Sequence, residues 1–343
     1  MSRDFQAVLQ EDLQWAKLEI LSVRRRESYS PVWEYLLFSV VQASKERDMQ
    51  QKWDAVIAGA GPAGASCAIW LRHLGFNPLL IEASSRVGGL VAANPFPDIW
   101  TASSPGMTGA QIARQIATHL KASQVPLRLS CPVTDLKLTE SGLAICVRSM
   151  NQVETLSART FVIATGVRPR GLHPGDTRKW PGVIVGPGEQ IANQDFNGLS
   201  VAILGGGDNG FENYEYVRQK GARQVHLYAR SVRAQKQFVM RADTADIKVG
   251  PYAVDPQARS VNGRVYELIL VFYGWEPELG FMPSLNVQLD ARGFVFTDPV
   301  TSQTSVPHVY AIGEVAQRMH PCMVTAMADG VVAAKAIEKL LST

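Results

Sequence analysis

The sequence predicts an α/β fold of two Rossmann-like three-layer domains, the second of them shortened, with a helical extension at the N-terminus. Two stretches carry this prediction, residues 54–83 and 201–217, because each places an apolar strand, a glycine-rich turn and a helix in that order. Between them, β-rich segments at residues 128–136, 143–149 and 160–166 are typical of a meander inserted after a βαβ unit. Strands that alternate with helices favour parallel sheets.

The composition fits a globular chain and excludes several partners. The 343 residues are 46% hydrophobic, which is enough for two packed domains. The formal net charge of +3 is small and basic residues do not interleave with aromatic ones, so nucleic acid is not an expected partner. The four cysteines form no CxxC pair and no metal-ligand spacing, so we expect a reduced, cytoplasmic compartment and no metal site.

Residues 1–50 are expected to form two helices that precede the first nucleotide unit. The second begins at Ser30 and Pro31 and is apolar nearly all round over residues 32–41. We expect the rest of the chain or a twin subunit to cover this surface, as in a homodimer. The alternative is a partner or membrane-surface contact, assisted by the basic run at residues 24–26. The apolar stretch is too short for a transmembrane span, no signal-peptide pattern precedes it, and a start at Met49 is a further alternative.

The first glycine-rich turn, residues 59–64, has the GxGxxG spacing of a dinucleotide site. Gly59 allows the tight turn, Gly61 lets the backbone approach a pyrophosphate, and Gly64 lets the next helix pack closely on the strand. Glu82 ends the second strand, where a carboxylate accepts hydrogen bonds from a ribose 2′-OH. Strand, turn, helix and acid agree, so we predict that a dinucleotide binds here.

Further motifs narrow the class of protein. The stretches "RVGGL", "FVIATG" and "TSVPHVYAIGEVAQ", followed by "TAMADGVVAAKAI", resemble those of the two-dinucleotide-binding flavoproteins. The resemblance is closest to the low-molecular-weight thioredoxin reductases and their ferredoxin-NADP reductase relatives, and it covers residues 53–343. We therefore expect an FAD-binding domain of residues 51–172 and 276–343, an NAD(P)-binding-like domain of residues 173–275, and a helical extension of residues 1–50.

The resemblance also assigns residues to FAD. The ADP part would contact Gly59, Gly61, Pro62, Ala63, Gly64, Glu82, Ala83 and the backbone of Val133. The ribityl chain and the flavin would be surrounded by Gly88, Gly89, Leu90, Asn94, Ala164, Thr165, Gly166, Gly313, Glu314, Met323, Val324 and Thr325. Glu314 departs from the aspartate that is usual in the family, and its contact with the ribityl chain or pyrophosphate would then pass through water.

The second glycine-rich turn, residues 205–210, would bind NADPH according to the same resemblance. It keeps the spacing and carries two polar residues: Gly205, Gly207, Asp208, Asn209 and Gly210. No acid follows the next strand to bind a 2′-OH, whereas Arg230 and Arg233 offer planar guanidinium groups to a 2′-phosphate. The alternative is that both arginines are solvated on a surface loop.

Two departures from the family separate the expected activity from that of a thioredoxin reductase. Gly186 and Glu189 stand where the family has its redox CxxC, so no thiolate is available there for disulfide exchange. Residues 236–273 are shorter than the equivalent family segment, and the shortening would weaken or abolish nicotinamide binding.

The expected protein is an FAD-dependent NADPH oxidoreductase whose acceptor is ferredoxin, flavodoxin or a quinone-like molecule. The alternative is a flavin-binding protein with a vestigial NAD(P) lobe, reduced by a partner protein or acting as a sensor. Cys322 aligns beside the flavin pyrimidine edge, where a thiol with a pKa lowered by a neighbour such as His320 would exchange electrons with the flavin. The favoured interpretation is a small buried residue that fills the site.

Overall fold

The structure is a computed structural model that describes residues 52–343, except 141, 150–151, 174–177, 282–283 and 319. These residues form one unit of the chain. The two helices expected within residues 1–50, and the alternatives for their surroundings, lie outside the described residues.

The first lobe is organised by a sheet of seven strands. β1 (Lys52–Ala58) lies between β2 (Pro78–Ile81) and β6 (Gln152–Ile163) and pairs parallel with both. The strand order is β3-β2-β1-β6-β5-β4, and β17 also pairs with β6. The other strands are β3 (Leu127–Arg128), β4 (Val133–Thr139), β5 (Gly142–Ser149) and β17 (Val309–Ala311).

β6 is longer than the sequence predicts because it belongs to two kinds of pairing. Its first half pairs antiparallel with β5, and its last residues pair parallel with β17. The segment expected at residues 128–136 is divided between β3 and β4, because Ser130 between them adopts a left-handed conformation (φ 51°) and Pro132 has no N–H. β3 therefore extends the parallel strands, whereas β4 opens the meander.

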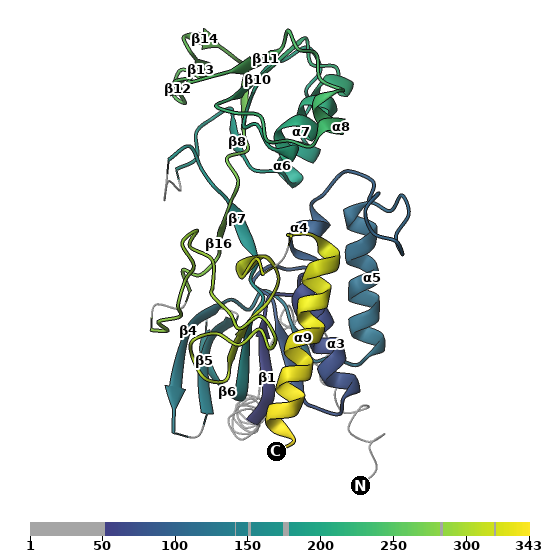
Figure 1. The fold of residues 1–343 in the computed structure, drawn as a ribbon, viewed down its shortest axis with the longest axis vertical. Coiled ribbons are helices and arrows are strands. Elements are labelled where there is room, and N and C mark those ends of the chain that lie inside the picture. Colours follow the sequence, from purple (N-terminus) through teal and green to yellow (C-terminus); the bar gives the residue numbers. More distant parts are fainter. Residues whose placement is uncertain (1–51, 141, 150–151, 174–177, 282–283, 319) are drawn as a thin grey trace, which may run out of the picture. The chain divides into compact units, whose positions relative to one another are not determined.

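Helices cover one face of this sheet, as Figure 1 shows. They are α3 (Pro62–His73), α5 (Gly109–Ala122) and α9 (Met323–Leu341), and the short α4 (Gly89–Ala92) precedes α5. Their core packs on Ile57, Leu80 and Val162. The opposite face buries the meander side chains Leu136 and Ile145. The carboxyl ends of β1, β6 and β17 lead into the first glycine-rich turn, residues 164–166 and the 3₁₀ helix η1 (Gly313–Val315).

The second lobe has an all-parallel sheet in the order β11-β10-β9-β15-β8. Its strands are β8 (Val183–Val185), β9 (Ser200–Leu204), β10 (Gln224–Ala229), β11 (Ile247–Val249) and β15 (Leu268–Val271). Its helices are α6 (Glu189–Ala192), α7 (Asp208–Gln219) and α8 (Lys236–Val239). The connections to the first lobe form an antiparallel ribbon of β7 (Val167–Pro169) and β16 (Trp275–Pro277).

The short segment of residues 236–273 still completes the second lobe. It supplies α8, β11 and a small antiparallel sheet of β12 (Val254–Asp255), β13 (Ser260–Val261) and β14 (Arg264–Val265). Beneath this sheet, the hydroxyl of Tyr266 lies 2.7 Å from both His226 Nδ1 and the Tyr228 hydroxyl. The three buried polar groups form hydrogen bonds with one another. Together with the apolar residues around them, they cover this face of the sheet in place of a long helix.

Candidate cofactor site

The first glycine-rich turn has the close backbone contacts that its spacing predicts. Gly59 has φ +111°, and a Cβ there would lie 2.3 Å from the Ala164 carbonyl oxygen. A Cβ on Gly64 would lie 1.9 Å from the Gly59 carbonyl oxygen, whereas one on Gly61 would meet nothing within 4 Å. Gly59 and Gly64 are therefore required by packing, and Gly61 faces open space.

The start of α3 is arranged to bind an anion. Gly61 is its N-cap, Pro62 is its first residue, no side chain caps its N-terminal N–H groups, and its first turn contains no acid. Uncapped N–H groups and the helix dipole both attract a phosphate. The described backbone at this point fits the pyrophosphate of a dinucleotide.

Glu82 braces the turn and faces the site. Its Oε2 accepts the Ala60 N–H at 2.7 Å, and its Oε1 accepts the Ser84 N–H at 2.8 Å. A carboxylate has about four acceptor positions, so each oxygen retains capacity for a ribose hydroxyl. The sequence predicted the second role of Glu82 but not its bond to the turn.

Two cavities share Gly59, Glu82 and Thr165 in their walls. The first cavity, of about 710 Å³ including its open mouth, is lined by the predicted residues Gly59, Gly61, Pro62, Ala63, Glu82, Gly89, Leu90, Ala164, Thr165, Gly166, Gly313, Glu314, Cys322 and Met323. The second cavity, of about 700 Å³ by the same measure, is lined by the predicted Gly59, Glu82, Ala83, Val133 and Thr165. Two cavities that meet at Glu82 suit a long ligand with a ribose at that point.

Five residues predicted for FAD lie outside the walls of both cavities. Gly64 and Gly88 act in packing: a Cβ on Gly88 would lie 2.5 Å from the Ala113 Cβ. Asn94 lines a different cavity, together with Asp208, Asn209 and Glu212. Val324 is 49% exposed, and Thr325 accepts the Cys322 N–H and donates to the His320 carbonyl, so it caps α9.

Sequence reasoning missed several wall residues. Val91, Val167 and Ile312 line the first cavity, and each directly follows or precedes a predicted residue. Cys131, Pro132, Glu278 and Phe281 line the second cavity. Glu278 and Phe281 follow β16, where the chain re-enters the first lobe, and they belong to no recognised sequence motif.

Glu314 and Cys322 occupy the end of the first cavity formed by η1 and α9. Burial raises the pKa of the Glu314 carboxyl above its ordinary value. The Cys322 thiol lies 3.4 Å from the Thr325 hydroxyl at the N-terminus of α9. Both side chains line the first cavity, together with Gly89, Gly313 and Met323, which the resemblance also assigns to the flavin half of FAD.

The second glycine-rich turn repeats the geometry of the first. Gly205 has φ +134°, and a Cβ there would lie 2.3 Å from the Phe272 carbonyl oxygen. A Cβ on Gly210 would lie 2.3 Å from the Gly205 carbonyl oxygen, and one on Gly207 would meet nothing within 4 Å. α7 starts directly after Gly207 without a side-chain cap. This turn can accept a pyrophosphate in the same way.

Arg230 and Arg233 lie on the loop after β10. Both are exposed, and neither forms an ion pair with a residue that the structure describes. The loop is tied to the turn, because the Arg233 N–H donates to the Gly206 carbonyl at 2.7 Å and the Gln235 N–H donates to Asp208 Oδ1 at 2.8 Å. Unpaired guanidinium groups held beside the turn suit a phosphate.

Two acidic residues lie close to the second glycine-rich turn, where they would repel a bound anion. Asp208 is the first residue of α7, and Glu212 lies one turn further along. Burial, and then the charges of Asp208 and Glu215, raise the pKa of Glu212 to about 7. The first turn of α3 contains no acid, so the N-termini of α3 and α7 match in shape but differ in their own charged residues, while Glu82 is the acid nearest the first turn.

The two positions that the resemblance aligns with the family's CxxC make other contacts in this structure. Gly186 has φ +76°, and a Cβ there would lie 2.4 Å from the Pro169 Cβ, so a cysteine does not fit without a shift of the backbone. Glu189 begins α6 and forms an ion pair with Arg86. All four cysteines are free, and burial raises the pKa of Cys67 to about 12.

The chain belongs to the pyridine nucleotide-disulphide oxidoreductase family, whose model matches residues 53–330. It is 30% identical over 295 residues to the ferredoxin–NADP reductase of Limosilactobacillus fermentum, covering 78% of this chain and 86% of that protein. It is 25% identical over 310 residues to the thioredoxin reductase of Chlamydia trachomatis, covering 83% of this chain and 97% of that protein.

Solved structures show the same fold. The thioredoxin reductase of T. acidophilum matches 86% of this chain and 100% of its own, with a TM-score of 0.71 at 22% identity. A bacillithiol disulfide reductase from Bacillus cereus matches 84% of this chain and 100% of its own, with a TM-score of 0.72 at 18% identity. The expected two-domain α/β fold is confirmed. The chain is an oxidoreductase, and its thioredoxin reductase and ferredoxin–NADP reductase relatives use FAD and NADPH.

The open space at Gly61 gives a test of the cofactor site. We expect Gly61→Val to fold normally and to lose its bound flavin, because the new side chain fills space that the pyrophosphate needs. Flavin absorbance of the purified protein measures the loss. Gly207→Val, the equivalent change in the second turn, is the control and should retain its flavin. A fully yellow Gly61→Val protein would contradict the site.

The raised pKa of Glu212 predicts a pH-dependent stability. Because its folded pKa of about 7 lies above the ordinary value of 4.5, the folded state holds the proton more tightly, and stability falls as the pH rises from about 4.5 through 7. Glu212→Gln should raise the free energy of unfolding at pH 8 by about 1 to 2 kcal/mol, after allowance for solvent screening, and by much less at pH 4.5.

Urea denaturation of both proteins at the two pH values measures this difference. Glu140→Gln, in the exposed turn between β4 and β5, serves as the control and should leave the pH profile unchanged. If Glu212→Gln changed the free energy of unfolding equally at pH 4.5 and pH 8, the pKa of Glu212 would not be raised in the folded state.

Proposed function

We propose that the protein is an FAD-dependent oxidoreductase that passes electrons from NADPH through the flavin to an acceptor other than a protein disulfide. The observation that carries the proposal is the pair of glycine-rich turns with one geometry, the first beside the two joined cavities and the second beside unpaired arginines. For the acceptor we propose ferredoxin, flavodoxin or a quinone-like molecule. The name of the Limosilactobacillus relative supports a ferredoxin.

We propose that FAD lies along the first and second cavities, in a domain of residues 51–172 and 276–343. The adenosine would occupy the cavity at Ala83 and Val133, with its ribose at Glu82. The pyrophosphate would meet the N-terminus of α3, and the flavin half would lie against Gly89, Leu90 and the start of α9. FAD, when bound, supplies the chemistry that links a two-electron nicotinamide donor to a one-electron or two-electron acceptor.

We propose that residues 173–275 bind NADPH at the second turn, with Arg230 and Arg233 on the 2′-phosphate. Asp208 orients the arginine loop through its two bonds to Gln235, at 2.8 and 2.9 Å. Its charge and that of Glu212 weaken the attraction for the pyrophosphate. NADPH should therefore bind reversibly, as a donor that leaves after each reduction must.

A specific observation favours the second candidate function, a flavoprotein whose NAD(P) lobe is vestigial. The first turn of α7 carries Asp208 beside the place where a pyrophosphate would lie, and a carboxylate there is unfavourable to an anion. In that case a partner protein would reduce the flavin. Anaerobic mixing with NADPH separates the two candidates, because only the first predicts bleaching of the flavin.

We also propose a cytoplasmic homodimer that acts on a redox partner protein or a small-molecule acceptor. The free cysteines support a reducing compartment. No helix among the residues that the structure describes is long and apolar enough to cross a membrane. Size-exclusion chromatography with light scattering measures the oligomeric state.

The unpaired arginines predict a preference between donors. NADPH should reduce the flavin at lower concentration than NADH, because one charge-assisted hydrogen bond to the 2′-phosphate contributes about 1.5 to 3 kcal/mol and thus at least about tenfold in affinity. Arg230→Ala should weaken NADPH and leave NADH nearly unchanged, and Gly207→Val should weaken both. Flavin bleaching in anaerobic stopped flow measures each rate. Equal loss of both donors in Arg230→Ala would remove the 2′-phosphate assignment.

The loss of the CxxC predicts little thioredoxin reductase activity. Gly186 cannot take a side chain beside Pro169, and Glu189 has no sulfur, so NADPH-dependent reduction of a protein disulfide should stay near background. Cys322→Ser should leave electron transfer to ferredoxin or quinone unchanged if the thiol only packs. Reduction of a disulfide substrate that disappears in Cys322→Ser would instead make Cys322 a catalytic residue.

A further inference from the structure

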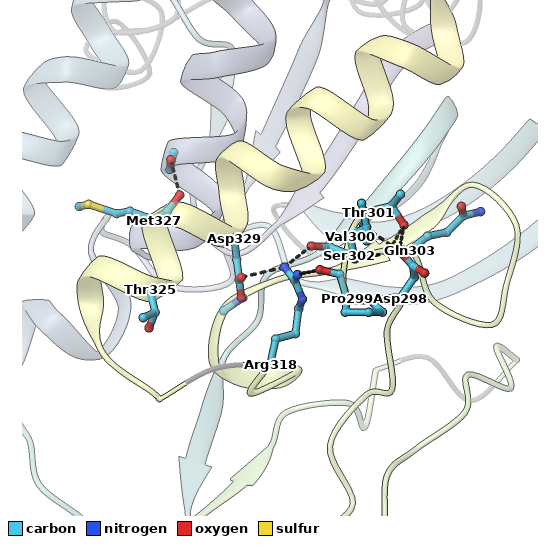
Figure 2. Close-up of polar contacts among 12 residues, drawn as sticks. Asp298, Pro299, Val300, Thr301, Ser302, Gln303, Arg318, Thr325, Met327 and Asp329 are labelled. Carbon is cyan, nitrogen blue, oxygen red and sulfur yellow. Dashed lines mark hydrogen bonds and ion pairs between the residues drawn. The ribbon is translucent and has the colours of Figure 1, made fainter.

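A buried ion pair lies behind the 3₁₀ turn η1 and contributes no residue to the first or second cavity. Arg318 Nη1 donates to Asp329 Oδ1 at 2.9 Å, and the two side chains are only 11% and 4% exposed. Figure 2 shows Arg318 extending toward Asp329 on α9 and toward the turn of residues 298–303. No sequence motif pointed to either residue.

The stability of the fold does not explain this pair. Desolvation of two charges costs about as much as their attraction returns, so a buried ion pair is often no more stable than apolar residues of the same size. Burial raises the pKa of Asp329 even though the Gly313 N–H and Arg318 both act to lower it. A role in geometry is therefore the better explanation.

The contacts of the pair join three segments of the chain. Asp329 Oδ2 accepts the Gly313 N–H at 3.1 Å. Arg318 Nη1 also donates to Ser302 Oγ at 2.7 Å, and its Nη2 donates to the Pro299 carbonyl. Asp329 thus joins α9 to η1, and the Arg318 guanidinium group joins Asp329 to the turn of residues 298–303 (Figure 2).

Gly313 is held tightly between this pair and the first glycine-rich turn. It has φ +74°, and a Cβ there would lie 2.9 Å from the Ala63 Cβ. Gly313, Glu314, Cys322 and Ala326 line the first cavity and also line a small neighbouring cavity with Arg318 and Asp329. Asp329 therefore holds from behind the same backbone that the first cavity presents to its ligand.

We propose that Arg318 and Asp329 are positioning residues for FAD: through the Gly313 N–H, their ion pair fixes the wall of the cavity formed by Gly313 and Glu314. This inference rests on the proposed FAD site. The Gly313 hydrogen bond is the functional part, and the charge of Arg318 compensates Asp329 and orients it. When Arg318 is replaced by a neutral residue, a neutral acceptor at position 329 should be enough to hold the Gly313 N–H and to retain FAD.

Two double variants separate these roles in the full-length holoprotein. Arg318→Met/Asp329→Asn removes both charges and keeps an acceptor for the Gly313 N–H. Arg318→Met/Asp329→Leu removes the acceptor as well. We expect the leucine variant to release FAD about tenfold faster on dilution than the asparagine variant, which corresponds to one hydrogen bond of about 1.4 kcal/mol. The asparagine variant should stay within about threefold of the wild type.

A second, more exposed ion pair in the same lobe gives a control. Asp54 Oδ1 pairs with Arg159 Nη1 at 3.3 Å, and Asp54 Oδ2 accepts the Asn77 N–H at 2.9 Å, at the opposite end of β1 from the first glycine-rich turn. Arg159→Met/Asp54→Asn and Arg159→Met/Asp54→Leu should release FAD at the same rate. Flavin fluorescence measures release, thermal unfolding measures stability, and the visible absorption bands of the flavin report its surroundings.

The outcomes are distinct. Faster release and shifted flavin bands in Arg318→Met/Asp329→Leu, with a thermal midpoint equal to that of the asparagine variant, support the proposal. Equal release from both variants, or a difference that follows the thermal midpoint or recurs in the control pair, overturns it. If the leucine variant does not fold, Arg318→Met/Asp329→Ala replaces it. A wild-type protein that binds no FAD would instead overturn the proposed function itself.

Discussion

The contact between a glycine and a carbonyl oxygen determines the geometry of both nucleotide turns in this chain. A Cβ on Gly64 would lie 1.9 Å from the Gly59 oxygen, and one on Gly210 would lie 2.3 Å from the Gly205 oxygen. Because only glycine permits this approach, α3 and α7 begin directly at the carboxyl edge of their sheets. Their N-terminal N–H groups then face outward, and the features of each site, such as Glu82 and the arginine loop, are arranged around that edge.

The two glycine-rich turns have the same backbone geometry, but the helices that follow them differ in charged residues. α3 starts with Pro62 and has no acid in its first turn, whereas α7 starts with Asp208 and carries Glu212 one turn later. Charges placed close to a bound phosphate interact by about 1 to 4 kcal/mol at the effective dielectric of a protein surface. The N-terminus of α3 is therefore the more favourable of the two helix ends for a bound phosphate. The raised pKa of Glu212 makes this difference depend on pH near neutrality.

Local sequence patterns predicted the α/β fold, and the family resemblance extended the prediction to residues that line the first cavity. The glycine spacing and Glu82 were predicted from the local order of strand, turn, helix and acid, whereas the segments around Thr165 and Gly313 were assigned through the family resemblance. The close approach of Gly88 to Ala113 of α5 was not predicted, because the motif does not encode this contact. The ion pair of Arg318 and Asp329 could not be predicted from the sequence, because its two residues come from separate segments whose contact appears only in the folded structure. The divided segment at Ser130 was missed because the turn there has no glycine.

Under the proposed function, the backbone at Gly186 constrains how electrons leave the flavin. With the Pro169 ring 2.4 Å from the Cβ position and φ at +76°, the loop does not accommodate a cysteine at this position, which the resemblance aligns with the redox CxxC. Under the proposed function, an acceptor must then reach the first cavity itself. At that cavity Leu90 is 42% exposed, so a partner meets an apolar side chain there. An acceptor with an apolar or planar surface fits this mouth better than a strongly hydrated one, because its approach removes apolar area from water.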